Sequence, residues 1–461
     1  MTKGREMMMR NNEVILLVDT LRKLHRRGAK VNIVKILQKT HPADLAHLFR
    51  SFTKEERHDF FKLMPDNQLR GNLISELDDA IIISLFDELE DMEIVKILLE
   101  MDYDDENAVL RILPEDLRDR LLELMKDDES RELEALMEYP DDSAGSLMTP
   151  EVFHLHEEYT AEEAIEKIRS AVDSEMVFYI YVVDDRNHLL GVVSLRQLII
   201  VAPRTRLRNI ISEEVISVHP ETDQEEVARI ISRYDFLAIP VVDKENKLLG
   251  IVTVDDIIDV MREEATEDLL QMAGVGRDRE IILKSTWEAS KIRFPWLFTT
   301  WVGGLIAAIV IGFFQEIISQ FVLLASFLPI IAGMGGNVGT QSSTIVTRGI
   351  ATGRVNPERY WHIVYNEFKI GLFLGFTYGL LLGIVSIFLY QATLFIGLTV
   401  AAAITFAMTL ATFIGTYGPI LLTRMKIDPA IATGPVVTTA IDILGIAIYL
   451  LIATFLSQWI G

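Results

Sequence analysis

The chain lacks cysteine altogether and has few basic residues for its number of acidic ones. Without cysteine it can form neither disulfides nor thiolate metal sites, which is compatible with a reducing cytosol. Its nine histidines are scattered, so zinc and copper, which favour thiol and imidazole ligands, are poor candidates. The N-terminus also lacks the apolar core of a signal peptide.

The balance of 44 Lys and Arg against 67 Asp and Glu gives a net charge of -23. An acidic surface repels nucleic acid and attracts divalent cations, although acidity also serves solubility alone. The charge is unevenly distributed, because residues 291–461 contain only eight Lys or Arg and five Asp or Glu. We therefore expect an acidic, soluble first part and a second part that lies in membrane lipid.

Long uncharged segments predict five membrane spans. Residues 294–315 and 317–347 carry no charge, and the 54 uncharged residues of 370–423 allow two helices with a break near Gln391. The fifth span follows Pro429. Each segment meets the requirement of roughly 20 residues for crossing hydrocarbon. Basic residues fall only in loops on the N-terminal side, which predicts an inner-membrane protein with a cytosolic N-terminus and an external C-terminus.

The last span carries a single charge, Asp442. An ionised carboxylate at the centre of a bilayer helix costs about 2.5–3.5 kcal/mol or more, so it normally faces a polar cavity or a partner. A twofold dimer would place two copies of Asp442 across a shared axis. Two carboxylates suit a hydrated divalent cation such as Mg²⁺. The alternative is that Asp442 hydrogen-bonds a neighbouring helix.

The second span ends in a glycine-rich sequence from Gly333 to Gln341. Its four glycines weaken a helix, and a broken helix in a membrane survives where it lines a cavity. Asn337 and Gln341 lie on adjacent turns and could share this lining, while close helix packing through small residues is the alternative. Glu367, near the cytosolic start of the third span, belongs either to the pore vestibule or to an interfacial ion pair.

An internal repeat occupies the middle of the chain. Leu189–Ile199 recurs as Leu248–Ile258 at an offset of 59 residues, and each copy should fold as strand, helix, strand, strand, helix. Two such copies indicate paired modules and resemble a tandem cystathionine-β-synthase (CBS) domain pair. The resemblance implies an ATP-type nucleotide site in which Thr253 and Asp256 hold the ribose. A purely structural pair is equally compatible with the sequence.

Acidic and amphipathic helices flank the repeat. Residues 10–140 alternate short amphipathic helices with polar turns, which predicts a right-angled or superhelical stack. After the second copy, residues 255–268 hold seven acids against one Arg. Asp256, Asp259 and Glu267 belong to a helical stripe whose mutual repulsion bound divalent cations would relieve. The alternative is a solvated helix face.

Over nearly its whole length the chain resembles the MgtE family of magnesium channels. The motifs are Met148-Thr-Pro150, Thr222-Asp-Gln-Glu-Glu-Val227, Glu264-Ala-Thr-Glu-Asp268, Gly335-Gly-Asn-x-Gly-x-Gln341, Asp428-Pro-Ala430 and the Asp442 segment. The implied architecture is an all-α superhelical N domain (1–140), an α/β CBS pair (141–263), an acidic connecting helix (264–293) and a five-helix membrane domain (294–461).

The same resemblance implies a homodimeric channel that takes up Mg²⁺ down the membrane potential and closes when cytosolic Mg²⁺ binds acidic residues. The implied pore residues are Asp442 and Asn337, with Asp428 at the cytosolic mouth. Gly434 departs from the family pattern of Asn or Ser before the proline and leaves only a backbone carbonyl for the ion. The implied regulatory acids are Asp223, Glu225, Asp235, Asp256, Asp259, Glu264, Glu267 and Asp268, with Asp104 and Asp105 as N-domain candidates.

Two other functions stay open on the sequence. A coupled secondary transporter would exchange a divalent cation for Na⁺ or H⁺, and the choice among Mg²⁺, Co²⁺, Mn²⁺ and Ca²⁺ is also open. A nucleotide-sensing membrane receptor would depend on Thr253 and Asp256 and would not need Asp442. An enzyme is not expected, because no nucleophile–base, paired-acid or metal-ligand constellation stands out.

Overall fold

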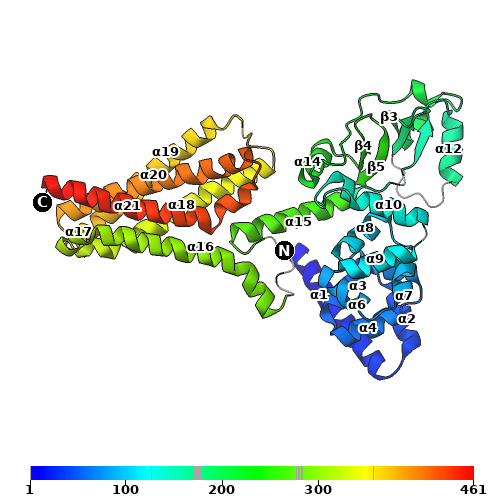
Figure 1. Cartoon of the computed structure of the whole chain (residues 1–461), viewed down its shortest axis with the longest axis horizontal. Helices are drawn as coiled ribbons and strands as arrows, with labels where there is room; N and C mark the ends of the chain where they lie inside the picture. The colour runs from blue at the N-terminus through cyan, green and yellow to red at the C-terminus, as the bar shows by residue number, and fades with distance from the viewer. Residues whose placement is uncertain are drawn as a thin grey trace. The chain divides into compact units, whose positions relative to one another are not determined.

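The computed structural model describes residues 2–125, 127–150, 152–170, 179–276, 278, 281, 284–356 and 358–460 (Figure 1). The chain divides into two compact units, Met1–Met261 and Arg262–Gly461. The first unit contains the N-terminal helices and the repeated modules, and the second contains the apolar helices.

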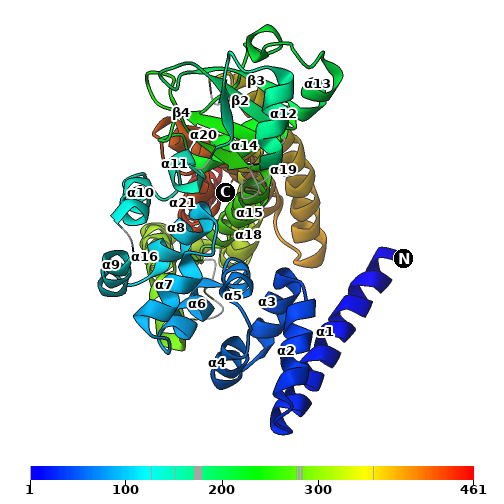
Figure 2. The same cartoon turned by 90° about the vertical axis from the view of Figure 1, so that its right-hand side faces the viewer.

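In the part of the chain that the structure describes, ten helices form the N-terminal stack, seen from a second side in Figure 2. Helices two apart in the sequence pack together, so that the odd-numbered helices from α1 to α9 form one row and α4, α6, α8 and α10 form another. This confirms the predicted superhelical stack. The bounds are α1 Thr2–Arg26, α2 Lys30–Lys39, α3 Pro42–Ser51, α4 Lys54–Lys62, α5 Asn67–Ile74, α6 Asp79–Phe86, α7 Asp91–Leu98, α8 Tyr103–Ile112, α9 Glu115–Leu124 and α10 Asp127–Met137.

Local sequence explains why these short helices begin where they do. Thr53 accepts a hydrogen bond from the backbone of Glu56, and the Glu56 side chain accepts one from Thr53, which is a capping box at the start of α4. Pro42 occupies the first turn of α3, where a missing amide proton is harmless. Fully buried Phe49, Phe60 and other apolar side chains join the rows in one continuous core.

The first CBS-like module contains all the predicted elements, and a short helix, α11 (Ala144–Leu147), precedes it. Strand β1 pairs in parallel with β2, which pairs antiparallel with β3. The second module replaces its first strand by a single parallel bridge between Val218 and Val241. The bounds are β1 His154–His156, α12 Ala161–Ser170, β2 Tyr179–Val183, β3 Leu189–Ser194, α13 Leu195–Ile200, η1 Leu207–Asn209, α14 Gln224–Tyr234, β4 Ala238–Val242, β5 Leu248–Thr253 and α15 Val254–Met272.

The two modules contact each other through equivalent residues. Asn187 donates from its side chain to the carbonyl of Leu248 (3.0 Å), and Asn246 donates to the carbonyl of Leu189 (2.8 Å). Both asparagines have a φ of 65°, a left-handed conformation that Asn tolerates in turns. Because each pair lies at the offset of the sequence repeat, the modules are related by approximate twofold symmetry.

Among the described residues of the second unit, five helices are long and apolar enough to cross a membrane. Within it α20 packs against α18, α19 and α21, and α16 packs against α21. The chain turns between α19 and α20 where a break near Gln391 was expected. The bounds are α16 Thr286–Phe313, α17 Gln315–Gln320, α18 Leu323–Ala351, α19 Trp361–Leu389, α20 Leu394–Arg424, η2 Pro429–Thr433 and α21 Pro435–Ile460.

Glycines at every fourth position allow α19 to lie against α20. A Cβ atom at Gly371 would come within 2.1 Å of the Thr412 hydroxyl, and one at Gly379 within 2.4 Å of the carbonyl of Ala401. Small residues are the usual means by which membrane helices approach closely, since lipid supplies no hydrophobic driving force between them.

Two expected helix boundaries differ from the structure. The acidic helix α15 begins at Val254, inside the second module, and ends at Met272, while residues 286–293 already belong to α16. The glycine-rich sequence does not break the second span, because α18 continues to Ala351. Close packing of Gly335, Gly336 and Gly339 against α21, and of Gly339 also against α20, compensates for their weak helix propensity.

Candidate functional site

Asp442 is half-buried in α21, beside a glycine of α18. A Cβ atom on Gly336 would lie 3.2 Å from the Asp442 carboxylate oxygen and 3.3 Å from the methyl group of Thr438. Within the described part of the chain, we find neither a hydrogen-bond donor nor a cationic partner for this carboxylate. The alternative in which Asp442 bonds a neighbouring helix of its own chain therefore has no support in the structure.

A polar stripe is exposed along α18. Asn337, Gln341, Thr344 and Arg348 succeed one another at spacings of three or four residues, and all four are exposed in the single chain. Spacings of three and four place residues on one helix face. Exposed amide groups in a membrane-crossing helix normally face water or a partner, because hydrocarbon cannot satisfy them.

Glu367 lies in another environment. Its carboxylate accepts a hydrogen bond of 2.7 Å from the hydroxyl of Ser342. Ser342 belongs to α18 and is buried. Ser342 is not on the exposed face that carries Asn337 and Gln341. The structure thus gives Glu367 a partner of its own rather than a place beside Asp442.

The end of the acidic helix packs on the start of α21. Gln271 is fully buried, and its side-chain amide donates to Glu267 (2.9 Å) and to Asp428 (2.8 Å). Asp428 also caps η2 by accepting from the backbone of Ala430. Gly434 lies beneath this helix end, because a Cβ there would be 3.2 Å from the Gln271 carbonyl oxygen.

Asp268 belongs to the same helix end. Burial, and next the nearby charge of Asp428, raise the pKa of Asp268 to about 6, although Arg348 acts in the opposite direction. A raised pKa means that the packed arrangement disfavours the ionised form. A cation at this helix end would therefore stabilise the contact with Asp428.

A second group of carboxylates lies between the N-terminal stack and the second CBS-like module. Asp256 accepts a hydrogen bond of 2.6 Å from Thr253 and contacts Asp104 on α8. Burial, followed by the charge of Asp104, raises the pKa of Asp256 to about 8. Burial likewise raises the pKa of Asp104, and it raises that of Asp105 to about 7. These carboxyl groups favour a shared proton or a bound cation over three separate charges.

The remaining predicted acids are dispersed. Asp223 caps the start of α14, where its side chain accepts from the backbone of Glu225 (2.9 Å), and Asp235 ends that helix with a φ of 54°. Asp259 and Glu264 lie on α15. Among the described residues no three carboxylate or imidazole groups lie close enough together to surround a metal ion. Any site with three protein ligands would need a further movement or a second chain.

Several residues that contact the candidate acids, or lie on the same helix face, were not predicted from the sequence. Gln271 continues the acidic stripe four residues after Glu267, and that spacing was the signal available for it. Asn107 and Arg111 follow Asp104 on one face of α8, but nothing in their type indicated a role. Ser342 could not be assigned to Glu367 because the two lie on different helices.

Comparison with known families agrees with this architecture. Residues 328–452 match a family described as a divalent cation transporter, MgtE, and residues 40–142 match the MgtE intracellular N domain. Residues 144–203 and 207–263 each match the CBS domain. With five candidate spans, these matches define a multi-pass membrane transporter of divalent cations.

The similarity to curated relatives identifies the family. The chain is 36% identical over 432 residues to the magnesium transporter MgtE of Bacillus subtilis (strain 168), covering 94% of this chain and 95% of the relative. It is 34% identical over 450 residues to that of Thermus thermophilus, covering 96% and 99%. The chain belongs to the MgtE family of magnesium transporters, which are not enzymes.

Two solved structures resemble about half of this chain. One is the cytosolic domain of the Mg²⁺ channel MgtE in complex with ATP, with 38% identity and a TM-score of 0.51 over 53% of this chain and 99% of the other. The second is the soluble part of a magnesium transporter, with 31% identity and a TM-score of 0.50 over 55% and 99%.

Proposed function

We propose that this chain is a homodimeric, inner-membrane Mg²⁺ channel that admits the ion down the membrane potential. The observation that carries this proposal is the exposed polar stripe of α18, together with an unpartnered Asp442. A second copy facing the stripe would enclose both in a water-filled path. Two Asp442 carboxylates would then attract a hydrated Mg²⁺, which gives up its water reluctantly.

The membrane potential supplies the driving force. A charge crossing the membrane gains roughly 2.3 kcal/mol per 100 mV, and a divalent ion gains about twice that. Arg348 near the end of α18, Arg354 after it and Arg424 at the end of α20 favour a cytosolic N-terminus, which would put the acidic domains inside the cell. Inward flow therefore ends at the domains that carry the proposed sensor.

Closure by cytosolic Mg²⁺ is the second part of the proposal. The crowded carboxylates Asp104, Asp105 and Asp256 pack together only against their own repulsion, and so does Asp268 beside Asp428. A cation that binds the packed state more tightly shifts the equilibrium toward it. When Mg²⁺ falls, repulsion separates these groups and the end of α15 leaves the start of α21.

The other acids of the regulatory set are Asp223, Glu225, Asp235, Asp259, Glu264 and Glu267. They are dispersed in one chain, so we propose that they contribute to Mg²⁺ binding across the dimer or through water. ATP at the CBS pair is a further proposal. It is supported by the ATP complex of the similar cytosolic domain and by the bond between Thr253 and Asp256.

The test is Mg²⁺ uptake into proteoliposomes under an imposed inside-negative potential. Asp442→Asn should lower uptake by about 100-fold, while Glu316→Gln, an equal change at the exposed helix α17, should leave it unchanged. Uptake by Asp442→Asn at the wild-type rate would refute the pore. Uptake that requires a Na⁺ or H⁺ gradient would establish the coupled transporter instead, and a panel of Mg²⁺, Co²⁺, Mn²⁺ and Ca²⁺ would determine selectivity.

A further inference from the structure

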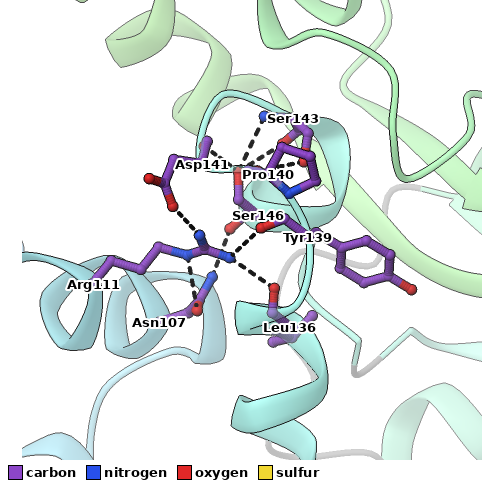
Figure 3. Close-up of polar contacts among 8 residues, drawn as sticks. All are labelled: Asn107, Arg111, Leu136, Tyr139, Pro140, Asp141, Ser143 and Ser146. Atoms are coloured by element: carbon purple, nitrogen blue, oxygen red, sulfur yellow. Dashed lines mark hydrogen bonds and ion pairs between the residues drawn. The ribbon is translucent and has the colours of Figure 1, made fainter. Parts of the chain in front are cut away.

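Arg111, on helix α8 of the N domain, joins this domain to the segment that leads into the CBS pair (Figure 3). Its guanidinium donates to the backbone carbonyls of Leu136 (2.7 Å) and Tyr139 (3.1 Å), and it forms an ion pair with Asp141. A third donor bonds the side-chain oxygen of Asn107 (3.3 Å). The fork of an arginine suits this task, because it offers several donors in fixed directions.

The position of Leu136 explains one of these bonds. It lies in the last turn of α10, where backbone carbonyls have no partner within the helix. A basic side chain that bonds such carbonyls stabilises the helix end. The Arg111 side chain is only 15% exposed, so water competes weakly for its donors.

Asn107 makes a second connection from the same helix. It is completely buried, and its amide donates to the carbonyl of Ser146 in α11 (2.9 Å). The Ser146 hydroxyl bonds the carbonyl of Asp141 (2.5 Å), which links this connection to that of Arg111. Figure 3 shows the two side chains of α8 directed toward one loop.

The partners of Arg111 outside α8 and the partner of Asn107 lie in one segment, from the end of α10 through α11, that packs on the second CBS module. The backbone of Ala144 donates to the carbonyl of Thr222 (2.7 Å), and that of Gly145 donates to the carbonyl of Pro220 (2.8 Å). Leu136, Ala144 and Met148 are buried in the core of that module. A bond from α8 to this segment is therefore a bond between the N domain and the CBS pair.

One face of α8 thus carries two kinds of contact. Asp104, Asn107 and Arg111 lie at spacings of three and four residues, so they share a face. At one end Asp104 meets Asp256, a contact between carboxyl groups that needs a proton or a cation. At the other end Asn107 and Arg111 form hydrogen bonds with backbone carbonyls, and Arg111 forms an ion pair with a carboxylate. These contacts need neither an extra proton nor a cation.

We propose that Asn107 and Arg111 form a pivot about which the N domain turns on the CBS pair. The proposal rests on the proposed closure by Mg²⁺ and adds a positioning role for two residues that bind no ion. When Mg²⁺ leaves, α8 separates from α15 at Asp104 and stays attached at Arg111. The pivot keeps the acidic faces close together, which lowers the Mg²⁺ concentration needed to bring them back.

The absence of cysteine makes this pivot directly measurable in the full chain. Spin labels at Lys96→Cys in the N domain and Lys244→Cys in the CBS pair, both exposed, report the distance between the domains. With the native Arg111 and Asn107, we expect a narrow distribution of label-to-label distances in millimolar Mg²⁺. In EDTA this distribution should be broader but still limited in range. Arg111→Ala should further broaden the distance distribution measured in EDTA. It should also raise about tenfold the Mg²⁺ concentration at which the distribution is halfway between its broad and narrow forms.

Arg120→Ala is the matched control, because Arg120 also pairs with an aspartate, Asp91, but within the N domain. If Arg111→Ala behaves like Arg120→Ala, the pivot is refuted. Arg111→Lys keeps the positive charge but lacks the several donors of the guanidinium group. Its distance distribution in EDTA should be intermediate in width between those of the wild type and Arg111→Ala. If Arg111→Ala does not fold, as judged by circular dichroism, Asn107→Ala replaces it in the same comparison.

The two proposals fail in different ways. If Mg²⁺ leaves the wild-type distribution unchanged, closure by Mg²⁺ is wrong, yet broadening by Arg111→Ala in EDTA would still demonstrate the pivot. If the wild type responds and Arg111→Ala responds identically, closure stands and the pivot is refuted. If the distance distribution of Arg111→Ala stays narrow in EDTA, the pivot is refuted as well.

Discussion

The buried carboxylates of the N-terminal unit have close acidic neighbours, whereas the half-buried Asp442 of the membrane spans has none among the described residues. Asp104, Asp105 and Asp256 lie close together, and burial, followed by the charge of Asp104, raises the pKa values of Asp105 and Asp256. Asp442 lies by itself beside Gly336, with no other charge of its own chain as a partner among the described residues. The same residue type is thus crowded in one region and isolated in the other.

In the proposed function, this difference separates Mg²⁺ sensing from ion conduction. Crowded carboxylates make the packed arrangement depend on cations, because neutralising their repulsion is the gain that binding provides. An isolated carboxylate can attract an ion without reorganising the protein around it. A passing ion must also be able to leave, and few direct ligands favour release.

The largest expected effect comes from neutralising the crowded pair. Asp104→Asn combined with Asp256→Asn removes the repulsion that Mg²⁺ would relieve, so the cation loses its preference for the packed state. Because no repulsion between these groups then opens the assembly when Mg²⁺ falls, we expect the open probability in Mg²⁺-free patch recordings to fall about tenfold or more, with the open-channel current unchanged.

The matched control removes two exposed acids of the same unit, with Asp116→Asn and Glu245→Gln. It produces the same change in net charge and should close normally. Equal shifts in the two double variants would mean that bulk charge, and not the crowded pair, controls the channel.

A smaller effect is expected from Gln271→Leu, which keeps the volume at the end of α15 but removes its bond to Asp428. Because Asp428 keeps its bond to the backbone of Ala430, the loss should be near the lower end of the range for a hydrogen bond to a charged group, about 1.5 kcal/mol, so the closed state should lose roughly a factor of ten in population. Single-channel open probability at saturating Mg²⁺ measures this change. Thr266→Val, on the exposed face of the same helix, should have no effect, and an identical increase in both variants would contradict the role of Gln271.

The smallest effect is a pH dependence of the stability of the packed N-terminal unit. The pKa values of Asp105 and Asp256 are raised to about 7 and about 8, above the value near 4 of an unfolded chain. Stability without divalent cations should therefore fall as pH rises from about 4 to about 8. Mg²⁺ should raise the melting temperature of the full chain more at pH 8.5 than at pH 5.5. An equal rise at both values would show that the cation does not act on these carboxyl groups.

Much of the fold could be predicted because its signals are local. The 59-residue repeat predicted two modules, and β-bulges occur at equivalent positions, Val182–Val183 and Val241–Val242. Uncharged segments predicted the five spans, and the turn at Gln391 followed from polarity alone. The continuous helix at Gly333 to Gln341 was not predicted, since propensity argued against it and packing partners outweighed propensity.

The candidate sites were predictable only in part. Asp442 stood out as a lone charge, and the acidic stripe of α15 was visible as a pattern. The meeting of Asp104 with Asp256 brings together residues about 150 positions apart, which no periodicity connects. The partner of Glu367 and the two bonds of Gln271 were hidden for the same reason.

By itself the sequence determined which segments lie in lipid, which form the repeated modules, and which acids are present. These follow from hydropathy and local spacing, which each segment carries wherever it folds. Only the tertiary structure decided which acids repel one another, which one is isolated, and which neutral side chains hold the domains together. Electrostatic energy depends on distance and burial, and both are set by the contacts between elements that are remote along the chain.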